Sequence, residues 1–202
     1  MLRLDHLAVA GETKDLATAH LAKLLGVDPV EGGEHAVFHT HNTLLGLGPD
    51  FYLEAIAVNS NAPPPGRPRW FNLDNFNGAP RLTNWVVACD DIRAALDILG
   101  EGYGEPVSLQ RGDLRWQMAV PQSGILPFDG FAPAVIEWRG PHPAPRLPDC
   151  GLRFGGLMVQ HPQADDMAAV LKPFLDADVQ FQTGTASLHA TFTGPKGSVT
   201  LA

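Results

Sequence analysis

Hydrophobic and polar residues alternate over the first stretch of this chain, and a helical pattern follows. Residues 2–10 alternate in polarity and are rich in Leu and Val, which is typical of a strand. Apolar residues then recur at roughly helical spacing over residues 14–25, with Thr13 placed as the N-cap and Gly26 as the stop. Three further strands are expected over residues 35–40, 42–47 and 51–58. The first 60 residues are therefore predicted to form one βαβββ module.

The same order of elements returns further along the chain. A strand is expected over residues 81–89, a helix over residues 91–99 that ends at Gly100, and strands over residues 107–110, 114–120 and 134–139. Residues 81–140 thus read as a second copy of the module. Residues 61–80 are the connector, which begins Pro-rich and whose aromatic residues indicate that it packs against the rest of the chain.

Residues 151–202 are predicted to form a third, shorter βαβββ-like module without ligand residues, serving as a scaffold, a cap or an interface. Its elements are expected over residues 152–160, 164–175, 179–183, 187–193 and 198–201. A doubly wound parallel sheet would need a helix after almost every strand, and this pattern has too few helices. We therefore predict an α+β protein of mixed, mostly antiparallel sheets, with each helix covering the outer face of a sheet.

Superimposing the two modules pairs chemically active residues. His6 matches Asn84 and Glu54 matches Glu137, and the intervals are similar: 48 residues separate the first and last positions in one module and 53 in the other. Imidazole and carboxylate groups bind divalent Mn, Fe, Co, Ni or Zn, whereas an amide oxygen is a weak, neutral ligand. The set predicts a metal site with open positions for a substrate. The alternative is a hydrogen-bonded core histidine and unrelated strand-edge charges.

Composition narrows the function. The 202 residues are 45% hydrophobic and carry a net charge of -8, with scattered basic residues, which argues against nucleic acid or an anionic membrane as a partner. No stretch resembles a signal peptide or a membrane span, so a cytoplasmic protein is expected. Cys89 and Cys150 form no CxxC pair and are expected to be free thiols.

Several segments carry a resemblance to a known family. They are His41-Asn42-Thr43-Leu44-Leu45-Gly46-Leu47, Tyr52-Leu53-Glu54-Ala55-Ile56, Leu114-Arg115-Trp116 and Ile136-Glu137-Trp138. With these segments the chain resembles the glyoxalase-like domain branch of the vicinal oxygen chelate superfamily, which includes glyoxalase I, extradiol dioxygenases and fosfomycin-resistance proteins. The resemblance covers residues 1 to 140 well and the remainder loosely.

This resemblance implies a fold and a site. The two modules would curl into a half-open barrel around a shared cavity, with metal ligands on the first and last strand of each module. The ligand positions carried over are His6, Glu54, Asn84 and Glu137, and Asn84 departs from the His, Gln or Glu common in the superfamily.

Two classes of function follow. The first is a divalent-metal-dependent enzyme, lyase-like or dioxygenase-like, that acts on a small oxygenated molecule; Glu54 or Glu137 would shuttle protons, and His41 would act as a general base or supply a missing nitrogen. The second is a metal-free protein that binds or sequesters a small molecule in the same cavity. Pairing into a homodimer is an open alternative. Substrate contacts are expected from Asn42, Tyr52, Arg115, Trp116 and Trp138.

Overall fold

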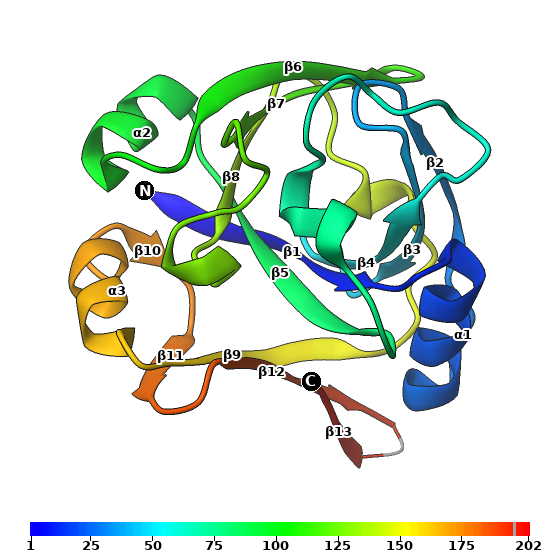
Figure 1. The fold of residues 1–202 in the computed structure, drawn as a ribbon. Helices are drawn as coiled ribbons and strands as arrows, with labels where there is room; N and C mark the ends of the chain where they lie inside the picture. Colours follow the sequence, from blue (N-terminus) through cyan, green and yellow to red (C-terminus); the bar gives the residue numbers. More distant parts are fainter. Residues whose placement is uncertain (196) are drawn as a thin grey trace.

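The computed structural model describes residues 1–195 and 197–202, and its first two units share one order of elements (Figure 1). The first unit contains β1 (Leu2–Ala10), α1 (Lys14–Leu25), β2 (Val30–His35), β3 (Thr40–Gly46) and β4 (Tyr52–Val58). The second contains β5 (Arg81–Ala88), α2 (Ile92–Leu99), β6 (Glu105–Arg111), β7 (Leu114–Val120) and β8 (Ala134–Trp138). Both units are therefore βαβββ modules.

The strand predicted at residues 35–40 is placed too late along the chain. The strand is β2, and the segment after it, up to His39, is a turn in which His39 has a φ of 49°. Gly32 and Gly33 lie within this strand. A Cβ atom on Gly32 would lie 2.2 Å from Oδ1 of Asn42, so close packing against the next strand requires glycine there.

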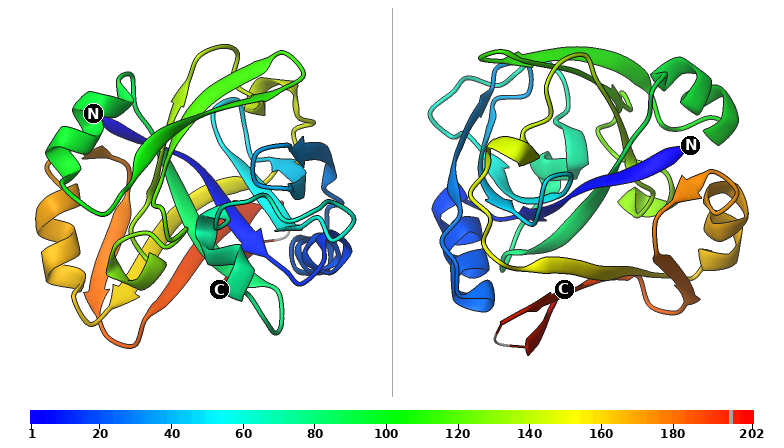
Figure 2. Two further views of the ribbon diagram at one scale, coloured as in Figure 1. Left: turned by 45° about the horizontal axis from the view of Figure 1, so that its top comes forward. Right: turned by 180° about the vertical axis from the view of Figure 1, so that it is seen from behind.

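The eight strands of the two modules, together with β10, make one curled sheet of nine strands whose central order is β2-β3-β4-β1-β5-β8-β7-β6. In each module the first strand pairs parallel with the last, and the modules join through the antiparallel pair β1 and β5. The two ends of the sheet approach each other, because a Cβ atom on Gly33 of β2 would lie 2.8 Å from Cδ of Arg111 on β6. The α+β prediction is confirmed, and so is the half-open barrel that the resemblance implied (Figure 2).

The third segment has a different strand order. Its sheet runs β11-β9-β12-β13, so its first strand lies inside the sheet, whereas β10 pairs with β1 of the barrel. Helix α3 ends earlier than predicted, because Pro173 cannot continue it. The domain boundaries stay a prediction. The elements are β9 (Arg153–His161), α3 (Ala164–Leu171), β10 (Leu175–Asp176), β11 (Val179–Thr183), β12 (Ser187–Gly194) and β13 (Gly197–Leu201).

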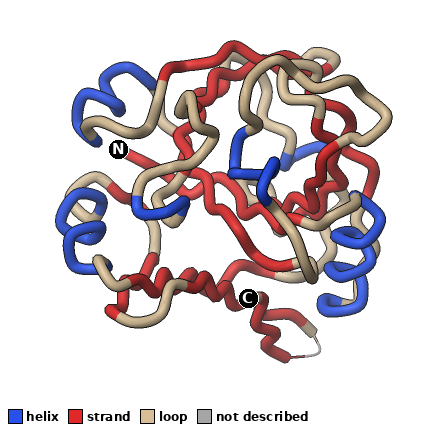
Figure 3. The backbone as a smooth tube through the Cα atoms, in the orientation of Figure 1, coloured by secondary structure: helices blue, strands red, loops and turns tan. Residues whose placement is uncertain are grey.

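The helices lie at the periphery and the strands at the centre (Figure 3). Helix α1 buries Ala17, Leu21 and Leu25, which are four residues apart and so share one face. As predicted, Thr13 caps this helix through the Leu16 N–H. No helix in the described residues is long and apolar enough to cross a membrane.

The connector covers the barrel. It contains the short 3-10 segment η1 (Trp70–Asn75), in which Trp70 and Phe71 are buried. The Trp70 ring stacks on Phe38 with the ring centroids 4.4 Å apart. The prediction that the aromatic residues of this connector pack against the fold is confirmed. Cys89 and Cys150 are both free.

Candidate functional site

A bulge in β1 turns two neighbouring polar side chains toward buried surroundings. The pairing of β1 with β5 shifts between Leu4 and His6, leaving Asp5 as the extra residue. Asp5 and His6 are only 4% and 3% exposed. Consecutive residues of a regular strand face opposite sides, so this arrangement depends on the bulge. Asp5 was not singled out from the sequence for that reason.

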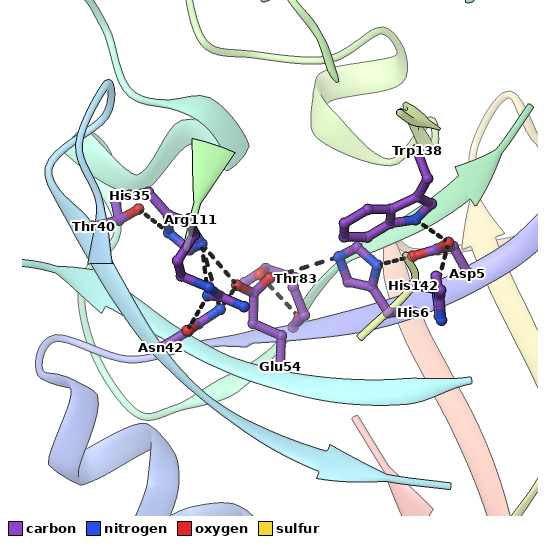
Figure 4. A network of polar contacts seen from close by, with 11 residues as sticks. Asp5, His6, His35, Thr40, Asn42, Glu54, Thr83, Arg111, Trp138 and His142 are labelled. Atoms are coloured by element: carbon purple, nitrogen blue, oxygen red, sulfur yellow. Dashed lines mark hydrogen bonds and ion pairs between the residues drawn. The ribbon is translucent and has the colours of Figure 1, made fainter. Parts of the chain in front are cut away.

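Asp5 is an acceptor for three side chains (Figure 4). One carboxylate oxygen lies 2.5 Å from Nδ1 of His6, and the other lies 2.9 Å from Nε1 of Trp138 and 3.1 Å from Nε2 of His142. Burial alone would raise the pKa of Asp5, but the hydrogen bonds from His142 and His6 outweigh it and hold that pKa well below its usual range. Asp5 is therefore ionised, and His6 donates through Nδ1.

The other nitrogen of His6 faces Glu54. Nε2 of His6 lies 3.7 Å from Oε2 of Glu54, and both side chains are buried. Tyr52, the direct partner of His6 across the parallel β1 and β4 pair, stacks on the imidazole with the centroids 4.5 Å apart. Burial raises the pKa of Tyr52 well above its usual value, and the charges of Asp5 and Glu54 act in the same direction. Tyr52 is thus a neutral wall that fixes the plane of the His6 ring.

A second polar chain continues from Glu54. Oε1 of Glu54 accepts a 2.5 Å hydrogen bond from Nδ2 of Asn42, and Oδ1 of Asn42 accepts a 2.9 Å hydrogen bond from Arg111. Nε2 of His35 lies 3.4 Å from the same guanidinium nitrogen, and Nδ1 lies 2.9 Å from the Thr40 hydroxyl. Burial and the charge of Arg111 lower the pKa of His35 to about 3, so this imidazole is neutral.

These groups surround a small cavity with aromatic walls. Its volume is about 20 Å³, room for roughly one water molecule. His6, His35, Asn42, Glu54 and Arg111 supply its polar lining. Its aromatic walls come from Tyr52, Trp70, Phe71, Trp116 and Trp138.

Of the predicted substrate contacts, Asn42, Tyr52, Trp116 and Trp138 lie at this cavity. Arg115 does not: it is exposed on β7, and its guanidinium donates to the carbonyl groups of Gly112 and Leu114. Trp116, the next residue, faces inward instead, as the alternation of a strand requires. Arg111 occupies the place that was expected for Arg115.

His41 also points away from the cavity, because it alternates on β3 with the inward-facing Asn42. It is partly buried near charged groups, and burial together with Lys14 lowers its pKa against the opposing charges of Glu34 and Glu31. His35 takes the position inside the cavity that the sequence suggested for His41. No spacing pattern in the sequence identified His35, Arg111 or His142.

Glu137 lies on the opposite face of the sheet from His6. Its neighbours Ile136 and Trp138 line the cavity, so the residue between them points outward. There Oε2 accepts a 3.0 Å hydrogen bond from the Ile92 N–H at the start of α2, and Oε1 lies 2.9 Å from Arg139. A negative charge at this helix terminus is favourable. The structure therefore does not bring Glu137 together with Glu54.

Asn84 shares the inner face with Glu54 but lies at a different cavity. Both residues pair directly with Ala8, one on each side of it, so all three point to the same face of the sheet. Asn84 lines a larger cavity, and Phe71 contributes to the walls of both.

The donor set does not fit the metal site expected from the sequence. His6 and Glu54 face each other, and Asp5 orients the imidazole as an outer-shell carboxylate would. The other two expected ligands lie elsewhere, and the guanidinium of Arg111 is joined to Glu54 through Asn42, which opposes a cation there. In the described part of the chain, no three His, Cys, Asp or Glu side chains are grouped to hold a metal ion.

Two solved structures with TM-scores above 0.5 support the fold. A hypothetical protein from Staphylococcus aureus matches with a TM-score of 0.67 and 14% identity, covering 93% of this chain and 88% of that one. A mutant 4-hydroxymandelate synthase from Streptomyces coelicolor matches with a TM-score of 0.51 and 13% identity, and the alignment covers 98% of this chain but 62% of the synthase. Methylmalonyl-CoA epimerase from Mycobacterium tuberculosis gives a TM-score of 0.43 and 17% identity, over 67% of this chain and 85% of the epimerase.

Comparison of sequences identifies the family. No curated protein matches the chain. The family described as "Glyoxalase-like domain" matches residues 4–175, which include both modules, the connector and the start of the third segment. This chain therefore belongs to the glyoxalase-like domain family.

Proposed function

We propose that this protein is a glyoxalase-type enzyme that transfers a proton on a small oxygenated molecule held in the half-barrel, with His6 as the acid and base. The observation that carries the proposal is the buried line Asp5, His6 and Glu54, in which the imidazole lies between two carboxylates. Buried histidines oriented by a carboxylate are frequent in general acid and base catalysis.

The hydrogen bonds of His6 define its role. Nδ1 keeps its proton and donates a hydrogen bond to Asp5, so the neutral ring has a free electron pair on Nε2. Nε2 takes a proton from a carbon beside a carbonyl group, and the electron pair of the broken C–H bond moves to the carbonyl oxygen. Asp5 and Glu54 stabilise the imidazolium that forms. Return of the proton to the neighbouring carbon completes an isomerisation. Where the substrate carries a leaving group on the β carbon, that group departs with its bonding electron pair, takes the proton from His6 and completes an elimination, which is the lyase-like chemistry expected from the sequence.

Arg111 gives the cavity its preference for an anion. Its guanidinium lines the cavity and is always protonated, so it stabilises an oxyanion or a substrate carboxylate. Asn42 links it to Glu54 and fixes its position. The neutral imidazole of His35 lines the same cavity and adds no charge to it. A small 2-oxo or 2-hydroxy acid combines the oxygen atoms and the acidic C–H or O–H group that this lining suits.

The substrate reaches His6 only when η1, which covers the cavity, moves. The cavity holds roughly one water molecule, and η1 closes it through Trp70 and Phe71. Displacing these two rings opens the aromatic chamber beneath them. Binding and release in this proposal therefore depend on the connector, as for other enzymes with closing segments.

Metal dependence is the finer part of the proposal, and only His6 and Glu54 support it as ligands. Elemental analysis of purified protein, before and after incubation with Mn, Ni, Zn and Fe, measures metal binding directly. One equivalent of metal that His6→Asn abolishes would support metal dependence, and no retained metal under any of these conditions would contradict it.

The second candidate is a metal-free binding protein. It is favoured by the positions of Asn84 and Glu137, which do not complete a metal site with His6. In that case the aromatic lining binds a small molecule without changing it, and chelator treatment leaves its affinity intact.

Hydrogen exchange separates the two functions. Pyruvate, lactate and methylglyoxal are incubated with the protein in D2O, and loss of C–H signals is followed by NMR. The proposal expects exchange of at least one compound, reduced about 100-fold or more by His6→Asn and unaffected by the matched variant His41→Asn on the outer face. Exchange that survives in His6→Asn would refute the role of His6. Binding without exchange would establish the binding protein instead.

A further inference from the structure

A second, larger cavity lies where four parts of the chain meet. Its volume is about 310 Å³, within the range of small-molecule sites. Its walls come from η1, from the start of β5, from the loop between β7 and β8, and from the start of β12 in the third segment. It is distinct from the cavity at His6, and Phe71 is common to both walls. Its lining includes Phe71, Phe76, Arg81, Asn84, Asp129 and Phe131.

Asn84 is the unusual polar group of this cavity. The residue is only 3% exposed, and its Oδ1 atom is buried without a hydrogen-bond partner in the described part of the chain. Buried polar groups in native proteins are nearly always paired, so an unpaired one at a cavity wall needs an explanation. An amide carries two donors and an acceptor side by side. A ligand with a matching acceptor and donor would satisfy it.

The remaining lining describes the ligand further. Phe71, Phe76 and Phe131 offer aromatic surfaces, which favour a flat aromatic molecule. Arg81 and Asp129 carry opposite charges at the wall, so the cavity has no net preference for an anion or a cation. The Arg81 guanidinium lies over the Phe76 ring at 4.3 Å and donates to the carbonyl of Asn77, so it is already engaged.

Backbone strain is concentrated in the same walls. Among the described residues, five other than glycine have a positive φ, and four of them form two consecutive pairs, Phe71 with Asn72 and Phe128 with Asp129. One pair lies in η1 and the other in the loop after β7, on two sides of the cavity. The two segments are tied together by a 2.9 Å hydrogen bond from the Asn72 N–H to the Gly124 carbonyl. Strained backbone of this kind clusters at ligand sites.

We propose that this cavity is a binding site for a planar, uncharged heteroaromatic molecule whose neighbouring hydrogen-bond donor and acceptor pair with the amide of Asn84. The aromatic walls enclose the ring system, and the amide selects the pattern of polar groups on its edge. This site does not depend on the reaction proposed at His6. Because Phe71 of η1 contributes to both cavities, a molecule bound here lies next to the segment that closes the cavity at His6.

Matched probes and variants test the site. The probes are adenine with purine, which lacks the amino donor, and indole-3-carboxamide with indole-3-carboxylate, which is charged. Titrations are followed through the side-chain NH2 resonances of Asn84 in NMR spectra of 15N-labelled protein. We expect adenine and indole-3-carboxamide to shift these resonances in a saturable way, and their counterparts to bind at least about tenfold more weakly.

Isothermal titration calorimetry measures binding to the variants, which lack the Asn84 resonances or serve as controls. Asn84→Leu should weaken both ligands at least about tenfold, while Asn77→Leu, outside the cavity, should not. Asn84→Ala is the second variant if the leucine disturbs folding, which circular dichroism reports. The proposal is overturned if neither adenine nor indole-3-carboxamide shifts the Asn84 resonances up to its solubility limit. It is also overturned if the folded Asn84 variant binds as tightly as the native protein.

Discussion

Asp5 is predicted to set both the stability of the site and the tautomer of His6. The variant Asp5→Asn keeps the shape of the side chain but removes its charge and one acceptor atom. In the native protein the carboxylate accepts from His6, Trp138 and His142. A hydrogen bond to a charged group contributes about 1 kcal/mol more than one between neutral groups. Three such bonds give an expected loss of about 3 kcal/mol, or a fall in melting temperature of roughly 6–12 °C.

The same variant changes which nitrogen of His6 carries the proton. If the new amide oxygen keeps the bonds from Trp138 and His142, its NH2 group faces Nδ1 of His6. The imidazole then accepts at Nδ1 and carries its proton on Nε2, toward Glu54. Nε2 loses its free electron pair and can no longer take a proton from the substrate. Long-range 1H-15N NMR spectra distinguish the two tautomers of His6, and urea unfolding measures the stability.

The pH dependence of this effect has a defined sign. The pKa of Asp5 is lower in the folded than in the unfolded protein, so its contribution is complete above the unfolded value, about 4, and is lost as the pH falls toward the native value. The difference between native protein and Asp5→Asn should shrink below that pH. Asp113→Asn, at an exposed ion pair with Arg146, is the control and should leave the unfolding midpoint unchanged. An unchanged midpoint and an unchanged His6 tautomer in Asp5→Asn would refute the reasoning.

Three further predictions concern neighbouring groups. The pKa of His35 is lowered from 6.5 to about 3, so below pH 6.5 the unfolded chain binds more protons than the folded one. The free energy of unfolding, measured with urea, should therefore fall as the pH drops from 6.5 toward 3. His35→Gln should make this free energy less dependent on pH over the same range. Arg111→Met should raise the pKa of His35 in an NMR titration, whereas Arg115→Met on the outer face should not, and equal shifts would contradict this. Glu137→Ala should cost about 1 kcal/mol through the lost bond to the Ile92 N–H, and a changed NMR signal of the cavity residues would speak against a purely capping role.

Local signals in the sequence were sufficient for most of the elements. The cap at Thr13, the stop at Gly26 and the alternation in the first strand each follow from interactions within a few residues, and each is present in the structure. The repeat of this order gave two modules. The strand expected over residues 35–40 was placed too late, because β2 includes Gly32 and Gly33, which lie against the next strand.

The candidate site was predictable only in part. His6, Glu54 and Asn42 were found by the repeat and the family motifs, and the structure places them in one network. Asp5 joins it through a bulge, and Arg111 reaches it because the two ends of the curled sheet meet. Both depend on contacts between residues distant in sequence, which no local pattern records.

The sequence by itself determined the α+β class, the duplicated module and a polar centre on its first and last strands, because periodicity and repetition are properties of neighbouring residues. Only the tertiary structure decided which face each side chain occupies. A shift of one residue in a strand reverses the direction of a side chain, so Glu137 caps a helix while Trp138 lines the cavity. The contribution of Phe71 to the walls of both cavities likewise follows from how the connector folds back onto the barrel.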